Sequence, residues 1–154
     1  QSILSNLFQL QKIQLGPLHP LTLSTFSNIS VLLSNQGRHQ EAEDICAEVL
    51  ESRRQVLGHA HRDTLQSLQD LCNLLMTQNK NIIAQKNLLE LVDWNTKIFG
   101  KNHFNTMKIE MNVGICLFRQ QKFEKAMNIF ANIVNTSKRK HESSQSSPVK
   151  KIKI

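Results

Sequence analysis

Apolar residues recur three and four positions apart in successive stretches of this chain, and short polar segments separate the stretches. Such spacing places the apolar side chains on one face of an α-helix, so each stretch predicts an amphipathic helix. In the first complete pair of helices these positions are Leu23, Phe26, Ile29, Leu32, Leu33, Ile45, Val49 and Leu50. The matching positions of the next pair are Leu65, Leu68, Leu71, Leu74, Leu75, Leu88, Leu91 and Val92. The pattern predicts an all-α protein built from helix hairpins.

The whole pattern returns with a fixed period of 42 residues. Residues 15–22, LGPLHPLT, return at 57–64 as LGHAHRDT and at 99–106 as FGKNHFNT. Ala42, Ala84 and Ala126 keep the same register, and a small residue there indicates that the second helix of each hairpin crosses the first closely. A period between about 20 and 50 residues indicates a solenoid, whose units bury their apolar faces by stacking on their neighbours.

The register divides the chain into a partial unit, three full units and a tail. Residues 1–14 correspond to the second helix of a truncated unit, so we expect the sequence to be a piece of a longer protein. The full units span residues 15–56, 57–98 and 99–137, and residues 138–154 form a basic tail that we expect to be disordered. First helices are expected at 20–35, 62–77 and 104–119, and second helices at 39–56, 81–98 and 123–137.

Three motifs of the first full unit resemble tetratricopeptide repeats of the 42-residue form found in kinesin light chains: LGPLHPLT at 15–22, QGRHQEA at 36–42 and RQVLG at 54–58. Similar units occur in nephrocystin-like proteins and in fungal receptor arrays. The resemblance covers about residues 1–137 and implies a right-handed α-α superhelix of helix hairpins. The later units depart from it, with His61-Arg62 and His103-Phe104 in place of His-Pro, and Ile83-Ala84 and Lys125-Ala126 in place of Glu-Ala.

In this family the first helices line a concave groove, where asparagines hold an extended peptide. Carried over by position, the asparagine slots hold Ser27, Asn28, Gln69, Asp70, Met111 and Asn112. The flanking slots hold Ser24, Val31, Asn35, Gln66, Asn73, Thr77, Lys108, Ile115 and Arg119. These residues lie off the apolar stripe, and amides can both donate to and accept from a peptide. Residues off the stripe are also expected to be merely solvated, so both interpretations stay open.

Composition indicates the setting of the protein. Hydrophobic residues make up 40% of the chain and aromatic residues 5%. No apolar run reaches the roughly 18 residues that a membrane span needs, so we expect no membrane partner. Cys46, Cys72 and Cys116 lie at helical positions suited to small apolar residues and form no C-x-x-C motif, which favours packed free thiols. Free thiols indicate a reducing, intracellular setting.

Patterns typical of catalysis are missing from the sequence. It has no Gly-rich phosphate loop, no nucleophile elbow and no arrangement of paired carboxylates, so we predict no enzymatic activity and no cofactor. His59 and His61 with Asp63 form part of a metal-site pattern, but no acidic or thiol set of the right spacing completes it, and we predict no metal site. His61 also has equivalents at His19 and His103, which favours a role in the turn.

Positive charge is concentrated in the tail. The net charge is +7, and residues 138–154 hold six of the 19 Lys and Arg residues but one of the 12 acidic residues. Two clusters, Lys138-Arg139-Lys140 and Lys150-Lys151-Ile152-Lys153, flank a Ser-rich spacer and resemble a nuclear localisation signal. Ser147 precedes Pro148 and resembles a proline-directed phosphorylation site. The alternative interpretation is a solvated tail that only aids solubility.

We therefore predict a non-catalytic scaffold or adaptor that binds a protein or an extended peptide in the groove, in the cytoplasm or the nucleus. A nuclear import receptor would be the partner of the tail. Two other classes stay open: a homo-oligomer that self-associates through the open ends of the array, and nucleic-acid binding by the tail. The sequence disfavours nucleic acid because no aromatic residues interleave the basic ones and most of the charge lies outside the repeats.

Overall fold

The computed structural model describes residues 2–145, apart from the side chains of residues 2, 4 and 140–145. This part of the chain contains seven α-helices and no strand. The helices are α1 (Ser2–Gln14), α2 (Pro20–Asn35), α3 (His39–Leu57), α4 (Arg62–Thr77), α5 (Asn81–Phe99), α6 (Phe104–Arg119) and α7 (Phe123–Gln145).

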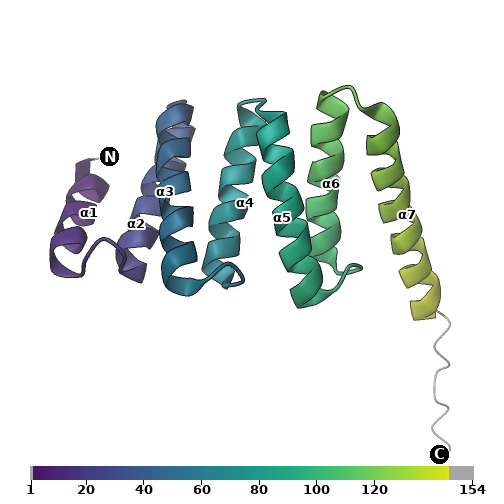
Figure 1. Ribbon diagram of the computed structural model, residues 1–154, viewed down its shortest axis with the longest axis horizontal. Coiled ribbons are helices and arrows are strands. Elements are labelled where there is room, and N and C mark those ends of the chain that lie inside the picture. Colours follow the sequence, from purple (N-terminus) through teal and green to yellow (C-terminus); the bar gives the residue numbers. More distant parts are fainter. Residues whose placement is uncertain (1, 146–154) are drawn as a thin grey trace, which may run out of the picture.

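The helices lie side by side along the long axis of the molecule, in chain order (Figure 1). Each helix makes its main contacts with its neighbours in the chain, so α2 with α3, α4 with α5, and α6 with α7 form hairpins that stack. Helices α2, α4 and α6 have the predicted bounds, and α3 and α5 end one residue later than predicted. The prediction of an all-α solenoid of stacked hairpins is confirmed.

Helix α7 is longer than predicted. We expected the last helix to end at Ser137 and the disordered tail to begin at Lys138, but the helix runs to Gln145. No Gly or Pro follows Ser137 before Pro148, and Lys and Arg are good helix formers, so nothing local stops the helix where the repeat ends. The first basic cluster therefore lies on a helix. Ser147 and the second cluster (Lys150, Lys151 and Lys153) lie outside the described residues.

The two helices of each hairpin cross at a fully buried alanine. Ala42, Ala84 and Ala126 each have 0% of their surface exposed. In the first unit the Ser30 hydroxyl donates to the Ala42 carbonyl oxygen at 2.9 Å, so the backbone of α3 lies within reach of a short side chain on α2. A larger side chain in place of these alanines would overpack the crossing, at a cost of about 1–3 kcal/mol. The predicted close crossing is confirmed.

Beside each crossing, a pair of equivalent residues shares a limited space. The pairs, one from each helix of a hairpin, are Ser30 with Cys46, Cys72 with Leu88, and Gly114 with Phe130. The side chain on the second helix grows from cysteine to leucine to phenylalanine, and the largest of the three has the smallest partner, Gly114. In the last pair the fit is complete, because a Cβ atom added to Gly114 would overlap the Phe130 ring. Different pairs of side chains thus fill the space beside the crossing in the three hairpins.

A histidine begins the first helix of every unit. The Nδ1 atoms of His19, His61 and His103 each accept a hydrogen bond, at 3.2 Å, from the backbone N–H two residues later. These N–H groups belong to the first turn of a helix, where they have no partner within the helix. The repeated histidine therefore has the role in the turn that was predicted. More specifically, it is the N-cap of the helix that follows.

A glutamine at the end of the first helix links the second and the third full unit to the unit before it. The Gln78 side-chain amide donates to the Glu43 carboxylate at 2.7 Å and to the His39 carbonyl oxygen at 3.4 Å. Its equivalent Gln120 donates to the Gln85 side chain at 2.9 Å and to the Asn81 carbonyl oxygen at 3.2 Å. All four bonds reach the start of the second helix of the preceding unit and so fix the stacking register.

The turn inside each hairpin requires a left-handed backbone at one position. That position holds Gly37 with φ 78°, Asn79 with φ 58° and Gln121 with φ 61°. Glycine adopts this conformation without steric cost, asparagine tolerates it, and a side chain such as glutamine is strained in it. The same turn is therefore best formed in the first full unit and most strained in the third.

We expect Gln121→Gly to raise the free energy of unfolding by about 1 kcal/mol, because it removes the left-handed strain. Asn79→Gly should give a smaller gain, and Gly37→Gln, the reverse change at the matched position, should lose about as much as Gln121→Gly gains. Urea unfolding followed by circular dichroism measures all three. Equal effects at positions 79 and 121 would show that backbone strain is not what distinguishes them.

Candidate functional site

The first helices of the three full units, α2, α4 and α6, present one set of side chains outward, which we call the helix-A face. All fifteen residues predicted for the groove lie on these three helices. None of them is buried: each is exposed or half-buried. They stay outside the apolar core, and the face is therefore accessible to a ligand.

The helix-A face is hollowed between α2 and α4. This hollow has a volume of about 180 Å³. Six predicted groove residues line it: Ser27, Val31, Asn35, Asp70, Asn73 and Thr77. Ser30, Ser34 and Leu74 complete the lining. The structure thus brings together predicted residues from two units in one small depression that is lined mostly by residues of polar type.

A larger hollow of about 500 Å³ lies between α4 and α6. Its apolar lining comes from Leu65, Leu91, Ile98, Phe99 and Ile109. Its polar lining comes from Arg62, Gln66, Gln69, Asn95, Asn105 and Lys108. No acidic residue is among those that line it, so the hollow combines apolar surface with two cationic side chains and several amides. Such a surface suits an apolar group that stands next to a negative charge.

The remaining predicted residues lie on the helix-A face outside both hollows: Ser24, Asn28, Met111, Asn112, Ile115 and Arg119. The Arg119 guanidinium donates to the Met76 carbonyl oxygen at 2.9 Å, so this side chain closes the end of α4. Two of the predicted groove residues are basic, Lys108 and Arg119. Of these two, only Lys108 lines a hollow. Sequence reasoning missed Arg62 and Asn105, because both lie in the first turn of a helix, one turn before the slots that the repeat motif identifies.

Two amides of the helix-A face are engaged along α4. The Gln66 side chain donates to the Asp70 carboxylate at 2.9 Å, and the Gln69 side chain donates to the Asn73 side-chain oxygen at 3.1 Å. Burial raises the pKa of Asp70, and the hydrogen bond from Gln66 and the charge of Arg53 oppose that rise. A carboxylate that is partly desolvated in this way is costly to keep charged.

A buried arginine supports this face from behind. Arg53 on α3 is 7% exposed. Its guanidinium donates to the Ser67 hydroxyl at 2.7 Å, to the Asp63 carbonyl oxygen at 3.2 Å and to the Ser24 hydroxyl at 3.4 Å. These bonds join α3 to both α2 and α4, so one side chain holds the spacing of the first helices on which the groove depends.

The groups that the sequence offered for chemistry serve structural roles. Burial raises the pKa of the Cys46 and Cys72 thiols to about 12, and burial also raises that of Cys116, so the thiols are protonated at neutral pH. His59 stacks on Trp94, with the ring centres 6.3 Å apart. Among the side chains that the structure describes, no three of His, Cys, Asp or Glu are grouped to hold a metal ion.

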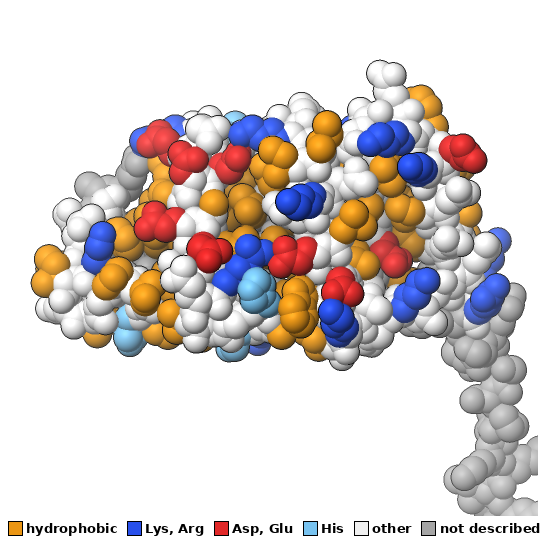
Figure 2. Space-filling view, in the orientation of Figure 1, with side chains coloured by type: hydrophobic (Ala, Val, Ile, Leu, Met, Phe, Trp, Pro, Cys, Tyr) orange, Lys and Arg blue, Asp and Glu red, His pale blue; other side chains and the backbone are white. Residues whose placement is uncertain are grey.

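Charge on the folded body is mixed. Figure 2 shows acidic and basic side chains interspersed over the face in view, with hydrophobic side chains between them. In the part of the chain that the structure describes, no helix has both the length and the apolar character that crossing a bilayer requires. The face in view thus carries no broad field of one sign.

The fold has known relatives. Residues 22–63 match the model of the tetratricopeptide repeat family. Two structures of a kinesin-light-chain-type protein with nearly identical TPR-like repeats, from Podosopora anserina, superpose on 92% and 90% of this chain, with TM-scores of 0.78 and 0.80 at 16% and 17% identity. The structure of BtubC (BKLC) from P. vanneervenii superposes on 99% of it, with a TM-score of 0.81 at 11% identity. The chain has the fold of a tetratricopeptide-repeat array of the kinesin-light-chain-like type.

Tetratricopeptide-repeat arrays serve in general as non-catalytic scaffolds that bind proteins or peptides, and this array has their fold. The chain spans 66%, 65% and 60% of the length of the three structures. No curated protein matches its sequence. The predicted resemblance to kinesin-light-chain-like repeats and the predicted fold are confirmed, whereas the roles of the individual groove residues stay predictions.

We expect Asp70→Asn to raise the melting temperature at pH 7, because it removes a partly buried charge and keeps an oxygen that can accept from Gln66. A raised pKa means that the folded state binds more protons than the unfolded state between the ordinary Asp value, about 4, and the raised one. Stability of the unmodified chain therefore falls as the pH rises through this window, and the advantage of Asp70→Asn should vanish below it.

Asp44→Asn is the matched control, because exposed Asp44 accepts from Gln40 at 3.0 Å with the same spacing along the helix. Thermal unfolding of both variants between pH 3.5 and 7.5 measures the difference. A gain at pH 7 that is equal at both positions, or that persists at the lowest pH, would contradict burial as the cause.

Proposed function

We propose that this protein is an adaptor or scaffold segment that binds an extended segment of a partner protein along the helix-A face. The observation that carries the proposal is the pair of hollows on this face, which adjoin along α4 and together gather nine of the fifteen predicted groove residues. Neighbouring helices pack about 8–10 Å apart, so successive units can contact successive residues of one peptide.

The lining indicates the chemistry of the ligand. Side-chain amides near both hollows can pair with a peptide backbone as donors and acceptors. The apolar lining of the larger hollow can receive an apolar side chain, and Arg62 with Lys108 can pair with an acidic residue beside it. Asp70 in the smaller hollow disfavours a second acidic residue there. The proposed ligand is therefore an extended segment with an apolar residue next to an acidic one.

Selection from a displayed library of random 12-residue peptides, followed by calorimetry, tests this proposal. Selected peptides should contain an apolar residue beside Asp or Glu. Lys108→Ala, Asn28→Ala and Asn112→Ala should each weaken binding several-fold without lowering the melting temperature, since a lost hydrogen bond costs about 0.5–1.5 kcal/mol.

Lys86→Ala is the control, because Lys86 is an exposed lysine on α5, away from both hollows. Peptides that bind all four variants as tightly as the unmodified chain would place the binding site elsewhere. The open ends of the array would then become the better candidate.

Exposed apolar residues at both ends favour self-association as that second candidate. Ile3 and Ile13 on α1 are each 81% exposed, and Leu10 between them is 57% exposed. At the other end, Met127 and Val134 on α7 are 61% and 50% exposed. Solenoid ends without a polar cap tend to associate. A molar mass that rises with concentration in light scattering, and that Ile13→Lys lowers, would support this role.

We further propose that the basic residues at the C-terminal end recruit a nuclear import receptor, so that the protein acts in the nucleus as well as the cytoplasm. The support is the exposure of Lys138 and Arg139 on α7 and the second basic cluster in the sequence. Receptors of this kind recognise short basic runs through charge.

We expect residues 138–154 fused to a fluorescent reporter to bring it into nuclei, and the triple change of Lys150, Lys151 and Lys153 to Ala to abolish import. Ser147→Asp, which adds charge beside the second cluster, should weaken import. Fluorescence microscopy of live cells provides the measurement. A cytoplasmic reporter with the intact segment would rule out an autonomous signal.

A further inference from the structure

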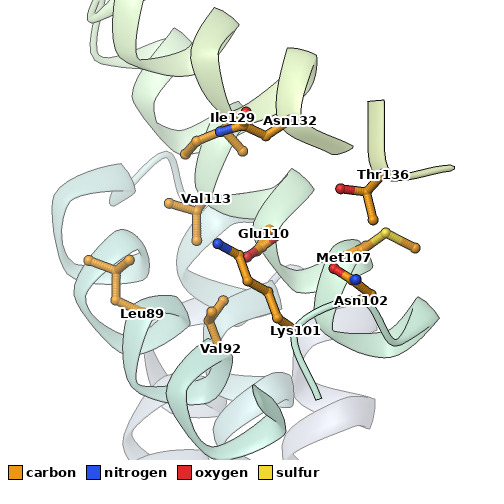
Figure 3. A pocket seen from close by; sticks show the side chains of 10 residues that line it. All are labelled: Leu89, Val92, Lys101, Asn102, Met107, Glu110, Val113, Ile129, Asn132 and Thr136. Atoms are coloured by element: carbon orange, nitrogen blue, oxygen red, sulfur yellow. The ribbon is translucent and has the colours of Figure 1, made fainter. Parts of the chain in front are cut away.

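A separate cleft of about 170 Å³ opens between α5, α6 and α7. Figure 3 shows the ten side chains that line it, with those of α5 and α7 on either side and those of α6 between them. Five of them are apolar: Leu89, Val92, Met107, Val113 and Ile129. On α6, the cleft uses Met107, Glu110 and Val113, which lie on a different helical face from Lys108 and Asn112. The cleft is thus distinct from the helix-A face.

The same place one unit earlier contains an indole. Trp94 occupies the position equivalent to Thr136 of the cleft, 42 residues before it. Trp94 is half-buried against the core, and its ring stacks on His59, the equivalent of Lys101. The Trp94 ring therefore fills the space between α3, α4 and α5. The equivalent space between α5, α6 and α7 stays open.

A second exchange changes the chemistry of the cleft. Leu68, which is 2% exposed, is replaced in the cleft by Glu110. Burial raises the pKa of the Glu110 carboxyl, and the charge of Lys101 opposes the rise. Figure 3 shows the two side chains close together in the cleft. Compared with the equivalent space one unit earlier, the cleft lacks an indole ring. It has instead the partly desolvated Glu110 carboxylate, a hydrogen-bond acceptor, among apolar walls.

We propose that this cleft binds an indole ring, the tryptophan side chain of a partner protein, with the indole N–H donating to Glu110. The apolar walls would cover the ring faces, as the core covers Trp94 in the preceding unit. An aliphatic side chain would fill the cleft but bring no hydrogen-bond donor to the partly buried Glu110 carboxylate, whereas the indole N–H adds one to the charge of nearby Lys101. A carboxylate ligand would be repelled by Glu110.

The four methionines of the chain supply a local readout. Met107 lines the cleft, Met111 belongs to the helix-A face, and Met76 and Met127 line neither. In protein labelled with ¹³C-methyl methionine, we expect N-acetyl-tryptophanamide to shift the Met107 resonance saturably and to leave Met111 unmoved. The 1-methyl-indole analogue, which lacks the N–H donor, should bind at least fivefold more weakly, and N-acetyl-leucinamide should not saturate.

Two variants complete the test. Thr136→Trp should fill the cleft with the chain's own ring, raise the melting temperature and abolish the Met107 shift. Glu110→Leu, which restores the residue of the preceding unit, should weaken binding at least fivefold and remove the preference for the N–H donor. If Thr136→Trp does not fold, as judged by the other three methyl resonances, Glu110→Leu still decides.

Three outcomes would overturn the proposal: a Met107 resonance that does not respond to the probe, a response that survives in folded Thr136→Trp, or equal affinities for the unmodified chain and Glu110→Leu. A shift of Met111 with Met107 unmoved would assign the probe to the helix-A face. That result would support the proposed groove while refuting the cleft as an indole site, so the two proposals fail separately.

Discussion

The close crossing of the two helices in each hairpin is the constraint on which the rest of this structure depends. Ala42, Ala84 and Ala126 are fully buried where the helices cross, and a short side chain on the first helix can reach the backbone of the second. Because the helices approach so closely, the volume beside each crossing is limited, and neighbouring residues must share it. Gly114 is therefore small because Phe130 is large, and neither residue can be understood without the other.

This shared frame leaves the outer faces free to differ between units. The buried arginine Arg53 sets the spacing of α2, α3 and α4 through hydrogen bonds, and the turn glutamines fix the register of successive units. On that frame, one unit carries Trp94 where the next carries Thr136. Differences of this kind produce hollows at some junctions and filled surfaces at others, although every unit has the same fold.

Most of the fold could be predicted from the sequence because its signals are local and repeated. The histidine caps, the turn glycines and the alanine register recur every 42 residues, and they gave the bounds of α2, α4 and α6. The end of α7 could not be predicted in this way. The repeat pattern marks the last residue that packs against the array, whereas the helix itself continues until a helix-breaking residue such as Gly or Pro stops it. For the candidate site, the motif indicated which helices to consider, but it could not indicate Arg62 and Arg53, because their contacts lie between units and no single motif contains them.

The restriction of contacts to adjacent helices has a mechanical consequence. Within residues 2–145 each helix is held mainly by the two next to it in the chain, so the main contacts run from neighbour to neighbour along the array. Small rotations at successive junctions can therefore add up to a bend of the whole array. No single interface has to break for this to happen. A partner that lies across several units would resist this bending and stiffen the array.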